Sequence, residues 1–374
     1  MPGLASCHFH ATFRQVTLTG APELGLEYPP AFAALIGADN LKRAIEAGVT
    51  SVACSSTSYA IDASLQRAVQ EELIPGPRML CGSHELMATS DIASGRGRSY
   101  WMEIGGHGTP RFCDGVEGVT YAVRDEISVG AEIVKLSVSR GHNVGVCEEM
   151  VNFTRAELEA AANTAHSCGK RVRAHASSKL AVLECARAGF DIIDHADKVD
   201  AECIEPLLQS GSFLVPGSRY LVQALAAFES EAFDTSALPR SARASFEATL
   251  GSMREELENI TRMLPELEAA GVKIALGDDY GTPFVLHGEY AKELTFYVKD
   301  VGIAPLDVVR WATLRGAELM GLADDLGTVA EGKLADLLVV DGDPLADIAC
   351  LENADRLHAI LKEGVFVKDA LPAN

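Results

Sequence analysis

Short apolar runs alternate with amphipathic stretches along most of the chain. Eight runs have the length and composition of buried strands, and they end near His10, Ser55, Gly82, Ser139, His175, His195, Pro216 and Asp279. Helical patterns lie between and after them, at residues 39–47, 61–72, 116–129, 155–168, 179–188, 201–209, 240–270, 289–301 and 305–320. Several of these end on glycine, which adopts the left-handed conformation that closes a helix. The pattern predicts the α/β class, with repeated βα units closed into a (β/α)8 TIM-type barrel.

The pattern changes after residue 326. Residues 327–368 show β-like alternation, and the strongest strand predictions are residues 335–340 and 359–362. Such short strands need neighbours to be stable. We therefore expect two parts, a barrel over residues 1–326 and a small β-sheet appendage over residues 327–374.

Composition and charge narrow the class of partner. The chain has 374 residues, 48% of them hydrophobic, with 32 Lys and Arg against 53 Asp and Glu, so the formal net charge is −21. A charge of this sign repels phosphate backbones and anionic lipids, so we expect a small-molecule substrate and neither nucleic acid nor membrane as partner. The nine cysteines form no CxxC pair and no targeting segment is recognisable. Both features indicate reduced thiols in a cytoplasmic protein.

The first strand ends in His8-Phe9-His10. A strand has a side-chain period of two, so both imidazoles lie on one face and can share a metal ion. Two nearby histidines are, however, more often ordinary surface or core residues. Their position at a strand's carboxyl end favours the metal site, because barrels of this kind keep their active sites there.

Other candidate ligands also fall at strand carboxyl ends. His175 and His195 end the fifth and sixth strands, and the eighth ends in Asp278-Asp279, of which alternation lets only one face the axis. Lys135 lies inside an otherwise apolar fourth strand. It could pair with a carboxylate, or burial could favour the neutral amine, which reacts with CO2 to give a carbamate that bridges two metals.

Recognisable motifs surround these residues. They are Pro2-Gly3-Leu4 with His8-Phe9-His10, Ile133-Val134-Lys135-Leu136, Arg173-Ala174-His175-Ala176, Asp194-His195-Ala196, Gly277-Asp278-Asp279-Tyr280-Gly281, Leu286-His287-Gly288 and Gly332-Lys333-Leu334-Ala335-Asp336. In them the chain resembles the amidohydrolase superfamily of metal-dependent hydrolases, in particular its imidazolonepropionase-like and Xaa-Pro dipeptidase-like branch. The resemblance runs nearly end to end.

The resemblance implies two divalent metal ions, with zinc the expected metal, and a CO2-derived carbamate on Lys135. It selects Asp279 over Asp278 as ligand and catalytic base. The implied ligands are His8, His10 and Asp279 for one ion, His175 and His195 for the other, and carboxylated Lys135 between them. The implied reaction is hydrolysis of an amide-type C–N bond, in a dipeptide, N-acyl amino acid, cyclic amide, carbamate or urea, by a metal-activated hydroxide.

Three alternatives stay open. A mononuclear deaminase of the same superfamily needs no lysine ligand, so Lys135 argues against it. A lactonase would use the same metal centre on an ester bond. A non-catalytic scaffold relative would have lost ligands, whereas all six positions are filled in this sequence. The oligomeric state is also open, and a homo-oligomer is one outcome.

Loop residues at the same strand ends are candidates for substrate binding: His107, Arg140, His142, Tyr220 and His287. Two features depart from the superfamily pattern. Members carry about sixty residues ahead of the HxH motif, enough for a few short strands, so we expect residues 327–374 to belong to a β-sandwich whose N-terminal part is missing from this sequence. Arg173 points into the barrel, where a guanidinium needs an acidic partner that the sequence does not identify.

Overall fold

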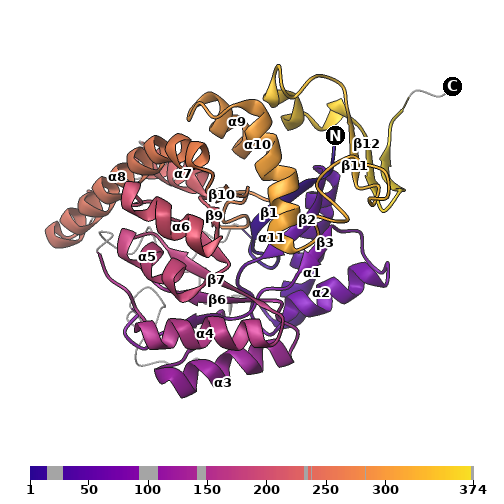
Figure 1. The fold of residues 1–374 in the computed structure, drawn as a ribbon. Helices are drawn as coiled ribbons and strands as arrows, with labels where there is room; N and C mark the ends of the chain where they lie inside the picture. The colour runs from indigo at the N-terminus through magenta and orange to yellow at the C-terminus, as the bar shows by residue number, and fades with distance from the viewer. Residues whose placement is uncertain are drawn as a thin grey trace.

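Eight parallel strands form a barrel wall in the computed structural model, which describes residues 1–14, 28–91, 108–140, 149–230, 235–236, 238–282 and 284–371 (Figure 1). The barrel prediction is confirmed, and every predicted strand is present. The barrel strands are β1 (Leu4–Phe9), β2 (Val49–Cys54), β3 (Arg78–Leu80), β6 (Ile133–Ser137), β7 (Arg171–Ala176), β8 (Ile192–His195), β9 (Phe213–Val215) and β10 (Lys273–Ile274).

The barrel is built from two hydrogen-bonded sheets, ordered β1-β2-β3 and β10-β9-β8-β7-β6-β4-β5. A few backbone hydrogen bonds join them, among them Cys7 N to Leu276 O at 2.7 Å and Ile133 N to Cys81 O at 3.0 Å. The two short strands β4 (Glu85–Met87) and β5 (Pro110–Phe112) were not predicted. Strand β4 pairs with β6, and β5 pairs with β4 at the end of that sheet.

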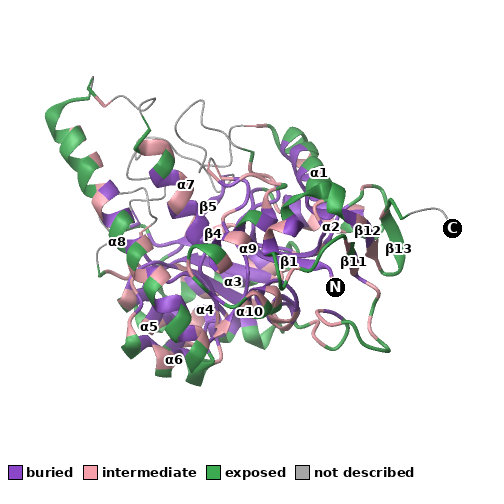
Figure 2. Ribbon diagram, turned by 90° about the horizontal axis from the view of Figure 1, so that it is seen from above, coloured by how far each residue is buried: buried purple, intermediate pink, exposed green. Residues whose placement is uncertain are grey.

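Helices surround the barrel, and Figure 2 shows their buried sides facing the strands and their exposed sides facing outward. They are α1 (Pro30–Glu46), α2 (Ile61–Gln70), α3 (Gly115–Ser128), α4 (Arg155–Ser167), α5 (Lys179–Ala188), η2 (Ala201–Cys203), α6 (Ile204–Ser210), α7 (Ser218–Phe228), α8 (Arg240–Ala270), α9 (Tyr290–Lys299), α10 (Pro305–Arg310), the π-helical η3 (Trp311–Arg315) and α11 (Gly316–Met320). Helix α7 was not predicted. No helix in the described ranges is long and apolar enough to cross a bilayer.

A register shift in β1 lets this strand both fill the barrel interior and point His8 inward at its end. Ala5 and Cys7 belong to the apolar cluster that fills the barrel interior, together with Ala53 and Ile133. Strict alternation would then turn His8 outward. Between Ser6 and Phe9, however, the pairing with β2 shifts. A bulge of this kind re-aims the side chains that follow it.

The C-terminal strands form a separate antiparallel sheet, in the order β11 (Leu337–Val340), β12 (Leu357–Lys362) and β13 (Val365–Asp369), with the short helices η4 (Ile348–Glu352) and η5 (Ala354–Arg356) between the first two strands. The start of the chain covers the free edge of β11, because Met1 exchanges two 2.9 Å backbone bonds with Leu338. Strand β11 therefore has a backbone partner at that edge, and the β-sandwich with a missing N-terminal part stays a prediction.

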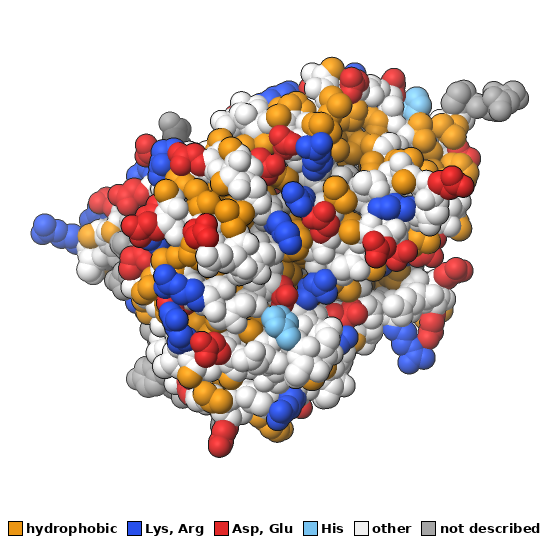
Figure 3. Space-filling view, viewed as in Figure 1, with side chains coloured by type: hydrophobic (Ala, Val, Ile, Leu, Met, Phe, Trp, Pro, Cys, Tyr) orange, Lys and Arg blue, Asp and Glu red, His pale blue; other side chains and the backbone are white. Residues whose placement is uncertain are grey.

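Strand β13 lies at the other edge, and its apolar side chains reach solvent. Val365 is 69% and Phe366 49% exposed. In Figure 3, apolar side chains gather at the upper right, in the region of this sheet. Among the described cysteines, only Cys168 is exposed.

Candidate active site

Five of the six predicted ligands come from one end of the barrel. His8 and His10 lie at the end of β1, His175 and His195 at the ends of β7 and β8, and Asp279 follows β10. Lys135 lies in the middle of β6, below them, and is 2% exposed. The carboxyl ends of parallel strands meet at one edge, so the fold gathers side chains that are up to 271 positions apart in the sequence.

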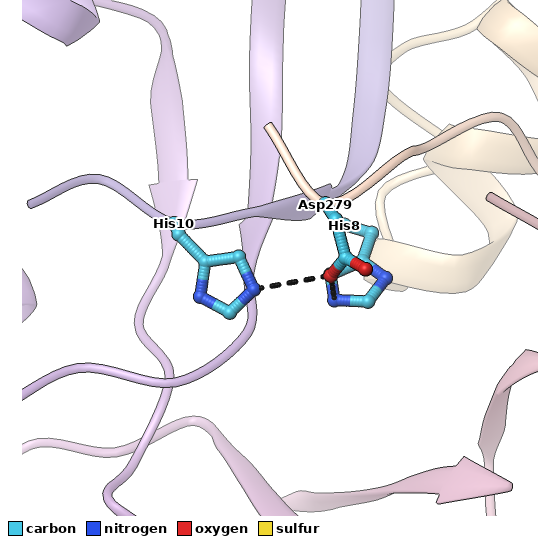
Figure 4. A group of neighbouring side chains, drawn as sticks. All are labelled: His8, His10 and Asp279. Carbon is cyan, nitrogen blue, oxygen red and sulfur yellow. Dashed lines mark hydrogen bonds and ion pairs between the residues drawn. The ribbon is translucent and has the colours of Figure 1, made fainter. Parts of the chain in front are cut away.

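His8, His10 and Asp279 form the tightest group (Figure 4). Asp279 Oδ1 lies 2.8 Å from His8 Nε2 and 3.3 Å from His10 Nε2. One ligand atom from each residue lies within 4.8 Å of the others. Two nitrogens and one oxygen thus surround a single point.

The other two histidines continue from this group. His195 Nε2 lies 4.0 Å from Asp279 Oδ2, and its ring centroid is 5.3 Å from that of His8. The ring of His175 follows at 4.5 Å from that of His195. Its Nε2 lies 2.9 Å from the carbonyl oxygen of Arg140. The four imidazoles therefore form a continuous row across the barrel end.

Asp194 is the acidic partner that Arg173 requires. Its Oδ1 lies 3.4 Å from Arg173 Nε, and its Oδ2 accepts from Lys135 Nζ at 2.5 Å. Burial opposes ionisation, but the charges of Arg173, His8 and Lys135 outweigh it and lower the pKa of Asp194 to about 2. Arg173 also donates to the carbonyls of Cys7 and Cys54. Lys135 thus adopts, in this structure, the carboxylate-paired arrangement.

Backbone geometry explains why sequence reasoning missed Asp194. Adjacent strand residues normally face opposite sides, so Asp194 and His195 should not both point inward. His195 has a φ of 71° and Ala196 a φ of 55°. Non-glycine residues adopt this left-handed conformation only where the surrounding structure imposes it, and such positions concentrate at functional sites. The turn brings His195 back over the barrel axis.

The donor set fits divalent metal ions. His8 is 1% exposed, and its ring nitrogens face carboxylates: Nε2 lies 2.8 Å from Asp279 Oδ1, and Nδ1 lies 3.8 Å from Asp194 Oδ1. Burial lowers the pKa of His8, which favours the neutral, ligating imidazole. For Asp279, burial is outweighed by His8 and His195, which hold its pKa well below the usual range. Neutral imidazoles beside an ionised carboxylate are the ligands that zinc and similar metals take.

Asp278 faces away from this cluster. Its Oδ1 accepts from Tyr220 N at 3.3 Å on the first turn of α7. Burial, with Glu293 and Asp279 adding to it, raises the pKa of Asp278 well above its usual range. Glu293 in turn accepts from Gly277 N at 3.1 Å. The alternation that assigned the two aspartates to opposite sides agrees with this geometry.

The predicted substrate-binding residues have varied surroundings. His107 and His142 lie outside the described residues. Tyr220 belongs to helix α7 rather than to a loop and is 5% exposed. His287 is bonded on both ring nitrogens, to Tyr290 Oη at 2.9 Å and to the His10 carbonyl at 3.1 Å, so it supports the His10 backbone. The partly exposed Arg140 follows β6. Contact of these residues with substrate stays a prediction.

Glu85 is a further site residue that the sequence did not reveal. It lies in β4, in register with Lys135 of β6. Burial raises the pKa of Glu85 to about 7, with Lys135 opposing and Asp91, Asp279 and Asp194 adding to the effect. A three-residue strand is too short to show alternation, which is why the pattern gave no signal here.

Comparison with known proteins gives consistent matches. Residues 1–367 match the amidohydrolase family. Ochratoxinase of Aspergillus niger is 26% identical over 388 residues, covering 98% of this chain and 75% of that protein. Its crystal structure superimposes with a TM-score of 0.82 at 25% identity, covering 99% of this chain and 83% of the other. A prolidase solved with N-methylphosphonate-L-proline gives a TM-score of 0.80 at 28% identity, with 99% and 86% covered.

Proposed function

We propose, since the chain belongs to the amidohydrolase family, that it hydrolyses an amide C–N bond of a small molecule with the help of two divalent metal ions, zinc being the expected metal. The observation that carries the proposal is the convergence of His8 Nε2 and His10 Nε2 on Asp279 Oδ1, at 2.8 and 3.3 Å. The row of imidazoles that continues through His195 to His175 supports a second ion.

We assign the candidate ligands to two positions. His8, His10 and Asp279, whose ligand atoms lie within 4.8 Å of one another, would hold one ion. His175 and His195 would hold the other. Lys135 would lie between them as a carbamate, which requires its ammonium to leave Asp194 and lose a proton. Arg173 then keeps Asp194 neutralised, because its Nε is already 3.4 Å away. Divalent ions bound there supply Lewis acidity, which activates water and polarises a carbonyl oxygen.

Asp279 has the position of the catalytic base. One of its oxygens faces His8 and His10 while the other lies toward His195, and the carboxyl group is 15% exposed, so it borders the space where a substrate would enter. A carboxylate with a lowered pKa is ionised at neutral pH and can take a proton from water. It can then pass the proton to the amine that leaves.

Two relatives narrow the substrate. Ochratoxinase and prolidase both act on amide bonds. We therefore propose dipeptides and N-acyl amino acids as the substrates to be tested first.

The test is metal analysis of the purified protein combined with a hydrolysis screen. Two equivalents of metal, with release of amino acid from such amides that stops on chelation and returns with zinc, are expected. One equivalent with ammonia release would instead indicate a mononuclear deaminase. Protein that stays metal-free after zinc is supplied, and inactive on every amide, would overturn the proposal.

A further inference from the structure

Glu85 points into the barrel. Its neighbour Leu86 belongs to the apolar core outside the barrel wall, as does Leu136, which pairs with it in register. Residues paired in register on parallel strands point to the same side, and successive residues alternate. Glu85 therefore faces inward with Lys135, whose side chain reaches Asp194 in the interior.

The Glu85 carboxylate has no hydrogen-bond or ion-pair partner among the residues that the structure describes, although the residue is only partly exposed. The other acids around it are engaged: Asp91 accepts from Ser137 Oγ at 2.7 Å, and Asp194 pairs with Lys135 and Arg173. Asp279 faces the histidines. A half-buried carboxylate without a partner costs free energy, and a counter-charge recovers it.

Basic side chains of the described barrel wall have other partners. Lys135 and Arg173 share Asp194. Arg219 pairs with Glu289 at 2.8 Å, and Arg111 with Asp125 at 2.6 Å. Among the described residues, these pairings leave the inward-facing Glu85 carboxyl group without a basic partner.

We propose that Glu85 determines specificity by receiving a cationic side chain of the substrate, so that the preferred amides carry a side-chain ammonium or guanidinium group, as lysine and arginine do. This inference rests on the proposed function and names the substrate class within it. Glu85 acts on binding and lies outside the His8, His10 and Asp279 group that fits a metal ion.

Matched substrates test the proposal. Dipeptides and N-acyl amino acids containing lysine or arginine are compared with the same compounds containing norleucine, which has the shape of lysine without its charge. A charge-assisted hydrogen bond to a half-buried carboxylate should give the wild type a kcat/KM ratio of about 10 to 100 in favour of lysine. In Glu85→Gln the ratio should fall to about 1, and in Glu85→Lys the preference should move to glutamate-containing amides. Glu117→Gln, an exposed change on α3, should keep the wild-type ratio.

A binding measurement separates this proposal from the function on which it rests. Calorimetry measures the dissociation constants of L-lysine amide and L-norleucine amide on the metal-loaded protein without relying on turnover. The wild type should bind the lysine compound more tightly, and Glu85→Gln should bind the two compounds equally. Active wild type with equal kcat/KM for the two substrates would overturn the Glu85 proposal alone. Loss of metal from Glu85→Gln would also overturn it, because Glu85 would then be a ligand. Wild type inactive on every amide would refute the proposed function, and equal binding of both compounds would refute Glu85 recognition.

Discussion

Lys135 Nζ lies 2.5 Å from Asp194 Oδ2, and both side chains are almost fully buried. Arg173 approaches the other oxygen of the same carboxylate. Two buried cations therefore share one buried anion. Such an arrangement can lose the charge of Lys135 and keep Asp194 neutralised, which is what carboxylation of the lysine demands.

If Lys135 bridges two metal ions as proposed, Lys135→Ala should remove that ligand and leave the fold intact. Metal content should drop from two equivalents to one or none, and kcat/KM by about three orders of magnitude or more, as for loss of a central catalytic group. Elemental analysis and substrate turnover measure the two effects. Lys42→Ala, at an exposed position on α1, serves as control. Retention of both ions in Lys135→Ala would contradict the binuclear centre.

Arg173→Met should destabilise the barrel strongly. The change keeps the approximate length of the side chain but removes its bonds to Asp194 and to the Cys7 and Cys54 carbonyls. Breaking a buried pair by removing one partner costs about 3 to 5 kcal/mol. Urea unfolding measures the loss in free energy of unfolding, and Arg187→Met, at an exposed position, serves as the reference variant. A loss close to that of the reference variant would show that Lys135 alone satisfies Asp194.

Asp279→Asn and Asp278→Asn should differ widely. Asparagine at 279 cannot act as a base, so turnover should fall by about three orders of magnitude. Asp278 has a pKa raised well above its usual range by burial and by Glu293, so a neutral amide resembles its protonated form and turnover should change by less than about tenfold. Steady-state kinetics of both variants measures the loss of turnover, and circular dichroism checks that both variants keep the fold. The reverse ranking would assign the catalytic role to Asp278.

Asp62 should make the protein less stable as pH rises from about 4 to 6. Burial raises the pKa of Asp62 from 3.8 to about 6, and the residue is 1% exposed. The folded state then holds its proton after the unfolded chain has lost it. Stability that is present below pH 4 is therefore lost through this window, by about 2 to 3 kcal/mol.

Asp62→Asn should remove this dependence, because the amide oxygen can still accept from Gly82 N. The free energy of unfolding of both proteins is measured by chemical denaturation in the presence of a chelator at pH 4, 5, 6 and 7. As the pH rises, the variant should become more stable relative to the wild type. Asp39→Asn, on the exposed face of α1, should shift it very little. A difference that stays constant with pH would mean that Asp62 is ionised throughout the range.

The strand pattern predicted the barrel and placed candidate ligands at strand carboxyl ends, because hydrophobic periodicity and strand polarity are local properties. Asp194 could not be assigned, since alternation lets only one of Asp194 and His195 face inward, and the left-handed turn that also brings His195 inward is not visible in the sequence. Helix α7 was taken for a loop, because Arg219 and Tyr220 carry polar groups on a turn that packs against Asp278. Glu85 depends on the partners of a three-residue strand, which only the assembled sheet supplies.

The shift in β1 changes the phase of the strand midway along its length. Below it, Ala5 and Cys7 point inward at odd positions, and above it His8 and His10 point inward at even ones. A one-residue insertion or deletion between Ser6 and Phe9 would change the alternation only of the residues that follow it. Ala5 would stay packed in the barrel interior. The imidazoles of His8 and His10 would turn outward, toward the surrounding helices. The number of residues between Ala5 and the two histidines is thus as constrained as the identity of the ligands themselves.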